Sequence, residues 1–221
     1  MRIIPIIGNN TESQHVSSSA TPFIYLASQS PRRSQLLDQI GVAHQILVAD
    51  ATEDAESLEI ALKNEAPLAY VTRVTALKLD AAVARMKLRG LPLAPVLCAD
   101  TTVAKGRILY GKPESEQDAA RMLTELSGSM HRVLTSVAVA HGAQGKKRLQ
   151  VVSESKVTFA KLSKAQVARY IATGEPMGKA GSYAVQGRAA TFIAKISGSY
   201  SGIMGLPMFE TAQLLGKLGF E

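Results

Sequence analysis

Residues 24–40 read Ile-Tyr-Leu-Ala-Ser-Gln-Ser-Pro-Arg-Arg-Ser-Gln-Leu-Leu-Asp-Gln-Ile and combine a short strand, a turn and the beginning of a helix. The apolar run at residues 24–27 predicts a buried strand. Ser30 followed by Pro31 is typical of a helix N-terminus, because proline at the first helical position forgoes no amide hydrogen bond. The free amides of that helix attract phosphate beyond the sheet edge. The turn also carries four side chains suited to phosphate: Ser28, Ser30, Arg32 and Arg33. The spacing alone is equally compatible with an ordinary turn and two solvated arginines.

The bulk composition is that of a globular protein with excess positive charge. The chain has 221 residues, of which 46% are hydrophobic and 19% charged, enough to bury a full core. Its net charge of +7 favours an anionic partner: a nucleotide, a nucleic acid or a membrane surface. The basic residues are scattered, however, and no basic stripe alternates with aromatic residues. Binding to nucleic acid is therefore disfavoured.

The single cysteine and the apolar runs bear on the compartment. Cys98 excludes a disulfide within the chain and fits a reducing environment, so we expect a cytoplasmic protein. No apolar run approaches the length of a membrane span, and we expect no membrane partner. Residues 1–21 are rich in Ser, Thr and Asn from residue 9 onward and are expected to form a mobile leader, ahead of a single domain at residues 22–221.

Periodicity predicts alternating strands and helices beyond the leader. The continuous apolar run at residues 96–99 predicts a central strand, and Asp100 follows at the strand end where α/β sheets keep their chemistry. Further strands are predicted at residues 45–48, 131–140, 149–159 and 189–196, and helices at 67–88, 116–126 and 207–218, with a loop at 198–207. The helix at 67–88 is expected to bury one face: Leu68, Val71, Val74, Leu77, Ala81 and Ala84.

Three polar segments complete the pattern. The loop at residues 50–59 carries five carboxylates, Asp50, Glu53, Asp54, Glu56 and Glu59, which suit a divalent cation beside phosphate-binding arginines; a solvated loop is the alternative. A turn at residues 111–113 presents Lys112, and the glycine density of residues 175–187 indicates close backbone approach. Metal-assisted chemistry on a polyphosphate is predicted by four features together: the turn that suits phosphate, the acidic loop, the aspartate at the strand end and the lysine in the turn. The sequence contains neither a P-loop nor a Gly-x-Gly-x-x-Gly turn.

These motifs, in this order, resemble the Maf family of nucleoside triphosphate pyrophosphatases. The matching segments are Leu-Ala-Ser-Gln-Ser-Pro-Arg-Arg at residues 26–33, Ala-Asp-Thr at 99–101, Gly-Lys-Pro at 111–113, Lys-Ala-Gly-Ser-Tyr at 179–183, Gln-Gly at 186–187 and Gly-Leu-Pro at 205–207. The resemblance runs from about residue 23 to the C-terminus. It implies a mixed α/β, inosine-triphosphatase-like fold: a long mixed sheet flanked by helices, with a cleft between two lobes. It also implies hydrolysis between the α- and β-phosphates, giving a nucleoside monophosphate and pyrophosphate.

The resemblance also implies roles for nine residues. Asp100 matches the proposed proton acceptor, and Glu53 the acidic residue that, with Asp100, would hold Mg²⁺ or Mn²⁺. Whether Asp100 acts as base or as metal ligand stays open, because a metal-bound carboxylate is a poor base. The polar and basic site residues are Ser28, Arg33, Lys78 and Lys112. The combination of Arg32, Thr101 and Gln186 is similar to the branch acting on dTTP and UTP, and differs from the branch acting on 7-methyl-GTP.

Some departures and alternatives remain. Thr52 stands where the family usually has a second acidic residue, which would lower metal affinity, and Ser136 stands where glycine is commoner. A regulatory septum-formation or nucleic-acid-binding protein with little catalysis is the alternative function. A modified-pyrimidine or CTP-like substrate is another. The oligomeric state stays open, a homodimer included.

Overall fold

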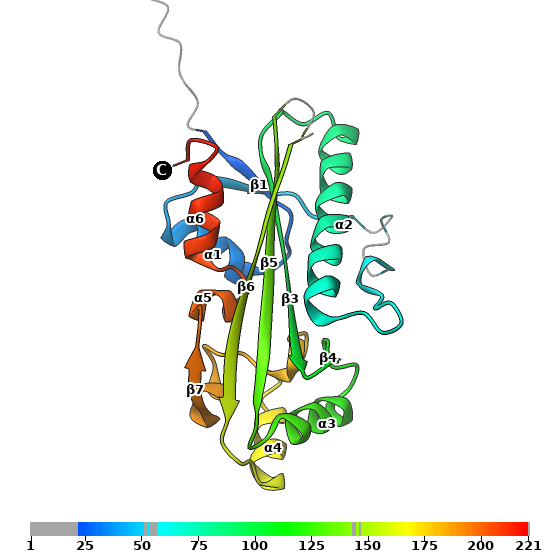
Figure 1. Ribbon diagram of the computed structural model, residues 1–221, viewed down its shortest axis with the longest axis vertical. Helices are drawn as coiled ribbons and strands as arrows, with labels where there is room; N and C mark the ends of the chain where they lie inside the picture. Colours follow the sequence, from blue (N-terminus) through cyan, green and yellow to red (C-terminus); the bar gives the residue numbers. More distant parts are fainter. Residues whose placement is uncertain (1–21, 51–52, 54–56, 143–144, 146, 221) are drawn as a thin grey trace, which may run out of the picture.

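A seven-stranded mixed sheet forms the centre of the protein (Figure 1). The computed structural model describes residues 22–50, 53, 57–142, 145 and 147–220, so the expected leader at residues 1–21 lies outside it. The strand order is β2-β1-β3-β5-β6-β7, with β4 beside β3; β1 is parallel to β2 and β3, and the other pairs are antiparallel. The strands are β1 (Ile24–Leu26), β2 (His44–Ile46), β3 (Val96–Lys105), β4 (Ile108–Tyr110), β5 (Met130–His141), β6 (Lys147–Phe159) and β7 (Ile193–Ser197). The predicted mixed α/β sheet is confirmed.

Helices cover both faces of the sheet. They are α1 (Pro31–Gln39), α2 (Pro67–Leu88), α3 (Glu116–Leu126), α4 (Lys164–Ile171), α5 (Tyr200–Met204) and α6 (Met208–Gly216), with single 3₁₀ turns η1 (Ser57–Glu59), η3 (Ala180–Ser182) and η4 (Arg188–Phe192). The predicted bounds of α2 and α3 are confirmed residue for residue. Ser115 caps α3 by accepting the amide of Asp118, and Ser163 and Gln166 form a reciprocal capping box on α4. No helix in the described part of the chain has the length and apolarity needed to cross a bilayer.

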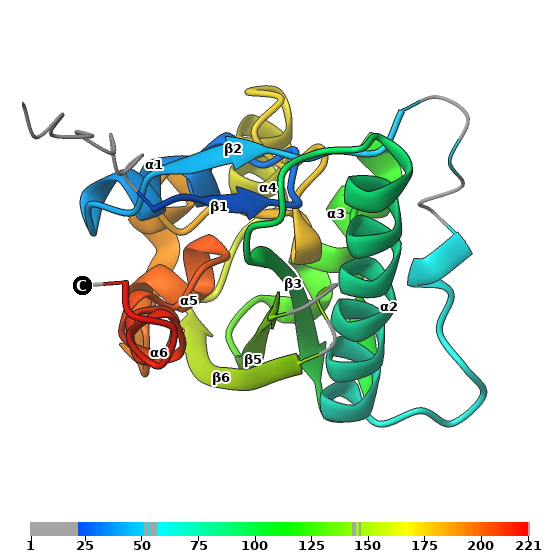
Figure 2. The same ribbon diagram turned by 90° about the horizontal axis from the view of Figure 1, so that it is seen from above.

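The period of two along the strands decides which helix covers which face. Val96 and Cys98 of β3 point to α2, whereas Leu97 and Ala99 point to the core shared with α1 and α6. Figure 2 shows α2 on one side of β3 and β5, and α6 on the other. Since β3 is covered on both faces here, its first four residues read as an unbroken apolar run.

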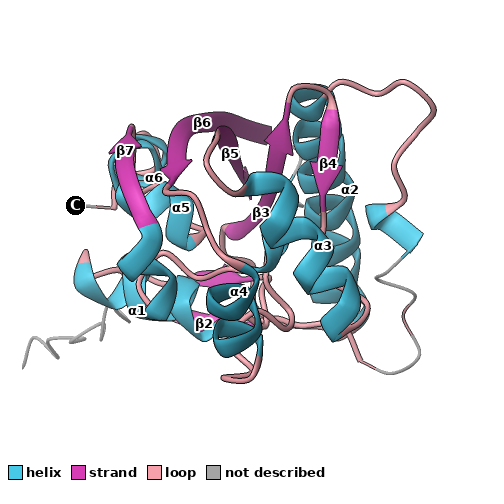
Figure 3. Ribbon diagram, turned by 90° about the horizontal axis from the view of Figure 1, so that it is seen from below, coloured by secondary structure: helices cyan, strands magenta, loops and turns pink. Residues whose placement is uncertain are grey.

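A separate core fills the opposite end of the long strands. Here α3 and α4 lie together (Figure 3) and pack with the far ends of β3, β5 and β6. The rings of Phe159, Tyr183, Tyr170 and Phe192 meet edge to face, with centroids 4.8–5.1 Å apart. Two packed ends joined by continuous strands correspond to the two lobes implied by the resemblance.

Two predicted segments near the C-terminus are wrong. The strand expected at residues 189–196 begins only at Ile193, because η4 precedes it: the Glu175 carboxylate accepts the amides of Arg188 and Ala189 and holds the backbone in a turn. The loop expected at residues 198–207 contains α5, which the Ser199 hydroxyl caps by accepting the amide of Gly202.

Candidate active site

A cleft of about 890 Å³ lies where the parallel strands β1, β2 and β3 end. Its walls come from the β1–α1 turn, the chain after β2, one stripe of α2, the middle of β3, and the segments around η3 and α5. Chain segments that are far apart in sequence therefore meet at the carboxyl ends of the parallel strands, the place where open α/β sheets bind ligands.

The β1–α1 turn fixes Arg33 at the floor of this cleft. The Ser28 hydroxyl, which is buried, accepts hydrogen bonds from Arg33 Nη1 at 3.0 Å and from the amide of Ser30 at 3.2 Å. Arg33 Nε donates to the carbonyl of Gly205 at 2.8 Å. The Ser30 hydroxyl makes no capping bond, although Pro31 begins α1 as predicted. The guanidinium is thus held by both neighbouring segments, in front of the helix N-terminus.

Adjacent residues of β3 serve opposite sides of the cleft. Because side chains alternate along a strand, Asp100 points to the same face as Cys98, toward α2, and Thr101 points the other way, toward Arg33. Thr101 Oγ1 lies 3.4 Å from Arg33 Nη2 and 2.9 Å from the hydroxyl of Thr135. The strand therefore presents a carboxylate and a hydroxyl to the same cavity from one dipeptide.

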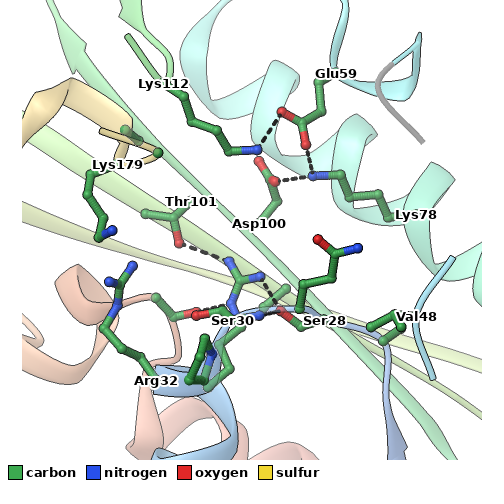
Figure 4. Close-up of a pocket in the computed structure, with 18 of the residues that line it drawn as sticks. Ser28, Ser30, Arg32, Val48, Glu59, Lys78, Asp100, Thr101, Lys112 and Lys179 are labelled. Carbon is green, nitrogen blue, oxygen red and sulfur yellow. Dashed lines mark hydrogen bonds and ion pairs between the residues drawn. The ribbon is translucent and has the colours of Figure 1, made fainter. Parts of the chain in front are cut away.

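A chain of alternating charges runs along the α2 side (Figure 4). Lys78 Nζ lies 2.6 Å from Asp100 Oδ1 and 2.7 Å from Glu59 Oε1, and Lys112 Nζ lies 3.5 Å from Glu59 Oε2. Burial lowers the pKa of Lys78, but Asp100 and Glu59 outweigh it, so its pKa is raised. Burial raises the pKa of Glu59, but the interactions with Lys78 lower it by more, so the pKa of Glu59 is lowered overall. Both groups are therefore ionised at neutral pH.

Glu53 lines the same cleft but is held by arginines. Its two carboxylate oxygens accept from Arg85 Nε and Nη2 at 2.6–2.9 Å, and Arg89 lies 3.4 Å away. The hydrogen bonds from Arg85 lower the pKa of Glu53. Arg85 is only 8% exposed and also donates to the carbonyl of Leu47. The acidic loop is thus tied to α2 at this point, and its neighbour Thr52 lies outside the described residues.

Two cations form the opposite wall. Figure 4 shows the charged ends of Arg32 and Lys179 pointing toward one another on the same side of the cleft. The pKa of Arg32 is lowered mainly by burial and also by the charge of Arg33. The pKa of Lys179 is lowered mainly by burial and also by the charge of Arg32. Arg32 Nε also donates to the carbonyl of Met204 at 3.3 Å. Two like charges partly removed from water gain stability from an anion between them.

The structure brings most predicted site residues together. The cleft lining includes Ser28, Arg32, Arg33, Glu53, Lys78, Asp100, Thr101 and Lys112. Gln186 is exposed and lies outside the lining that the described residues form. The sequence indicated Glu59 only as one carboxylate of the acidic loop and Lys179 only as part of a motif, and it did not single out Arg85. A signal existed for one of them: Lys78, Ala81 and Arg85 follow the i, i+3, i+7 spacing of a single helix face.

Oxygen donors for a cation are present but dispersed. Asp100 and Glu53 both face the cleft, each already paired with a basic side chain. Within the described ranges, no three His, Cys, Asp or Glu side chains gather closely enough to form a metal cage by themselves.

The chain is similar in sequence to known proteins over most of its length. The family model described as "Maf-like protein" matches residues 23–218. A dTTP/UTP pyrophosphatase from Albidiferax ferrireducens is 66% identical over 199 residues, covering 90% of this chain and 98% of that protein. One from Polaromonas sp. is 59% identical over 202 residues, covering 91% and 98%. Among solved structures, a HAM1 protein from Coxiella burnetii aligns with a TM-score of 0.48 at 10% identity, covering 89% of this chain and 99% of that one.

Proposed function

Since the chain belongs to the Maf-like protein family, we propose that it hydrolyses dTTP and UTP between the α- and β-phosphates, releasing a nucleoside monophosphate and pyrophosphate. Two relatives that are 66% and 59% identical, and that align over nearly their full length, are dTTP/UTP pyrophosphatases. The proposal assigns the activity to residues 22–221 acting as one domain, supported by the continuous sheet. A cytoplasmic location is supported by the single, buried cysteine.

One observation carries the proposal: a carboxylate and a set of cations face one another across a single cavity. Asp100 lies at the centre of β3, and Lys78, Lys112, Arg33, Arg32 and Lys179 line the same cleft. A triphosphate carries several negative charges, which this excess of basic groups neutralises. A protein that only bound anions would gain no affinity from the carboxylate of Asp100.

The protein's own groups divide the work as follows. Asp100 orients or deprotonates a water molecule aimed at the α-phosphorus, and the Lys78 ammonium fixes the carboxylate by donating to Oδ1. Arg33, Lys78 and Lys112 stabilise the negative charge that builds up on the departing pyrophosphate. The bonds from Arg33 to Gly205 and Ser28 keep its guanidinium in place before substrate arrives, so little reorganisation is needed.

The residues present fit a divalent metal that is bound jointly with the substrate. Mg²⁺ commonly binds through one or two carboxylates together with substrate phosphates, and needs no cage built by protein alone. Asp100 and Glu53, both in the cleft lining, would supply those carboxylates. When bound, such an ion would neutralise phosphate oxygens and lower the pKa of water.

Base selection is assigned to Arg32, Thr101 and Gln186. A glutamine amide donates and accepts at once, as the 4-oxo and 3-imino edge of thymine or uracil requires. Val185, the residue before Gln186, lines the cleft, which places Gln186 next to the cleft in the chain.

Pyrophosphate release over a panel of nucleotides tests the proposal. The panel contains dTTP, UTP, CTP, 7-methyl-GTP and inosine triphosphate, each with Mg²⁺, with Mn²⁺ and with a chelator. We expect turnover of dTTP and UTP well above that of 7-methyl-GTP, and its loss in the chelator. Salt-sensitive retention on DNA without pyrophosphate release from any nucleotide would overturn the proposal in favour of a binding protein.

A further inference from the structure

We propose that Glu59 is an internal substitute for the substrate's phosphates: it pairs with Lys78 and Lys112 and gives them up when an anion binds. This inference rests on the proposed function, because it assigns both lysines to the phosphate chain. It makes Glu59 a positioning residue, which acts through two lysines and not on the reacting atoms.

Glu59 lies between the two lysines. The Glu59 carboxylate spans the two lysines, with one oxygen 2.7 Å from Lys78 Nζ and the other 3.5 Å from Lys112 Nζ. All three residues line the cleft. A carboxylate bridging two ammonium groups occupies the same kind of position that a phosphate oxygen pair would take. The bound anion and Glu59 therefore compete for the same donors.

The backbone of Glu59 is held in place, whereas its side chain can rotate. The Tyr70 hydroxyl donates to the carbonyl of Glu59 at 2.9 Å, and Arg73 donates to the carbonyl of the next residue, Ile60, at 2.9 Å. Arg73 is itself held by two hydrogen bonds of 2.7 Å that it donates to the Glu65 carboxylate. The backbone at Glu59 is thus fastened to α2. Release of the lysines then requires only rotation of a half-buried side chain.

Glu59 also sets the net charge of this group of side chains. Asp100, Lys78, Glu59 and Lys112 alternate in sign, so the four groups sum to zero. Without Glu59 the same groups sum to +1, and Lys112 loses the contact to Glu59 that now opposes anion binding. The side chain of Lys112 is 62% exposed and its contact is the longest of the three, so this link yields first. Glu59 thereby weakens binding of the triphosphate and of the pyrophosphate product alike, and its return favours product release.

Binding of inorganic pyrophosphate measures this competition without any turnover. Isothermal titration in metal-free buffer compares the wild-type protein with Glu59→Gln, and with Glu59→Ala as a second variant. We expect the Kd for pyrophosphate to fall roughly three- to tenfold, the range expected when one opposing partial ion pair is removed. An unchanged or higher Kd in a folded variant would overturn the inference, as would the absence of pyrophosphate binding by the wild type and the variants.

Two further proteins make the comparison specific. Asp80→Asn removes one negative charge from α2, but Asp80 pairs with Arg148 outside the cleft lining, so its Kd should stay near that of the wild type. In a Lys112→Met background, Glu59→Gln should lower the Kd for pyrophosphate by a smaller factor than it does in the wild-type background. Thermal unfolding verifies that each variant folds. If the wild type hydrolyses dTTP but Glu59→Gln leaves the Kd for pyrophosphate unchanged, only the role of Glu59 is refuted. If Glu59→Gln lowers the Kd but the wild type hydrolyses no nucleotide, only the enzymatic proposal is refuted.

Discussion

The Lys78 ammonium lies 2.6 Å from one oxygen of the Asp100 carboxylate, inside the cleft and at the middle of the sheet. Asp100→Asn keeps the shape of the side chain but removes the charge that orients water or a metal. We expect turnover on dTTP to fall on the order of a hundredfold or more. Steady-state pyrophosphate release measures the loss, and Asp80→Asn is the control because exposed Asp80 pairs with Arg148 outside the cleft. Substantial turnover by Asp100→Asn would remove this residue from the mechanism.

Arg33 uses three nitrogen atoms to bind three separate partners, namely Gly205, Ser28 and Thr101. A lysine carries the same charge on one nitrogen and cannot span them. We expect Arg33→Lys to lower the free energy of unfolding by roughly 1–3 kcal/mol and to reduce kcat/KM at least tenfold. Urea unfolding and kinetics measure the two effects.

Exposed Arg107 provides the control for Arg33. It donates to the carbonyl of Asn64, and Arg107→Lys should change the free energy of unfolding by less than about 0.5 kcal/mol. Equal losses of unfolding free energy in both variants would show that the three hydrogen bonds of Arg33 contribute no more to stability than the single bond of Arg107.

Gly187 lies against the Glu175 carboxylate so closely that a Cβ at this position would collide with it. The φ of Gly187 is −104°, so the cost of Gly187→Ala is steric and not a matter of backbone strain. We expect a loss of roughly 1–3 kcal/mol in the free energy of unfolding. Because the Glu175 side chain is the obstacle, Gly187→Ala should cost less in a Glu175→Ala background.

Urea unfolding of the wild type, Gly187→Ala, Glu175→Ala and the double variant tests the collision. If the two single losses of unfolding free energy simply add in the double variant, the collision is contradicted. The same variants should also change the ratio of dTTP to 7-methyl-GTP turnover, because Gln186 adjoins Gly187 in the chain.

His131 is 1% exposed, and its Nε2 lies 2.9 Å from the Tyr183 hydroxyl. Burial, and then the charge of Lys105, lower its pKa from 6.5 to about 4. Between these values the unfolded chain binds a proton that the folded protein excludes, so stability falls as pH falls through this window. We expect a loss of about 1 kcal/mol between pH 7 and pH 5.5. Urea unfolding at the two pH values should show this loss in the wild type and less of it in His131→Phe; an identical loss in both would exclude His131 as its source.

Local signals predicted the elements well where the sequence has clear boundaries. Helix α2 begins at Pro67 and α3 follows the Ser115 cap, as expected. The buried face of α2 was predicted less well, because Leu68 and Leu77 are 51% and 38% exposed, whereas Leu79 and Met86 are buried. Apolar residues occur around much of this helix, so periodicity alone does not identify the side that meets the sheet.

The site was predictable where one short motif carries the chemistry, as in the β1–α1 turn and the strand-end Asp100. The family model and the identity to dTTP/UTP pyrophosphatases confirm the resemblance that these motifs indicated. Contacts between distant segments were not predictable. Glu59 meets Lys78 and Lys112, and Arg85 meets Glu53, only because the chain after β2 folds back on α2. The spacing of residues along the sequence does not predict such tertiary pairs.

The long strands join both packed ends of the molecule without interruption. At about 3.3 Å per residue, the 12 residues of β5 extend roughly 40 Å, through the aromatic core at one end and the α2 core at the other. Within the described residues these strands run unbroken from one end to the other, so we expect nucleotide to enter by local side-chain and loop adjustments and not by rigid-body opening. Heating should accordingly give one calorimetric endotherm, because neither end retains a complete sheet once the other has melted.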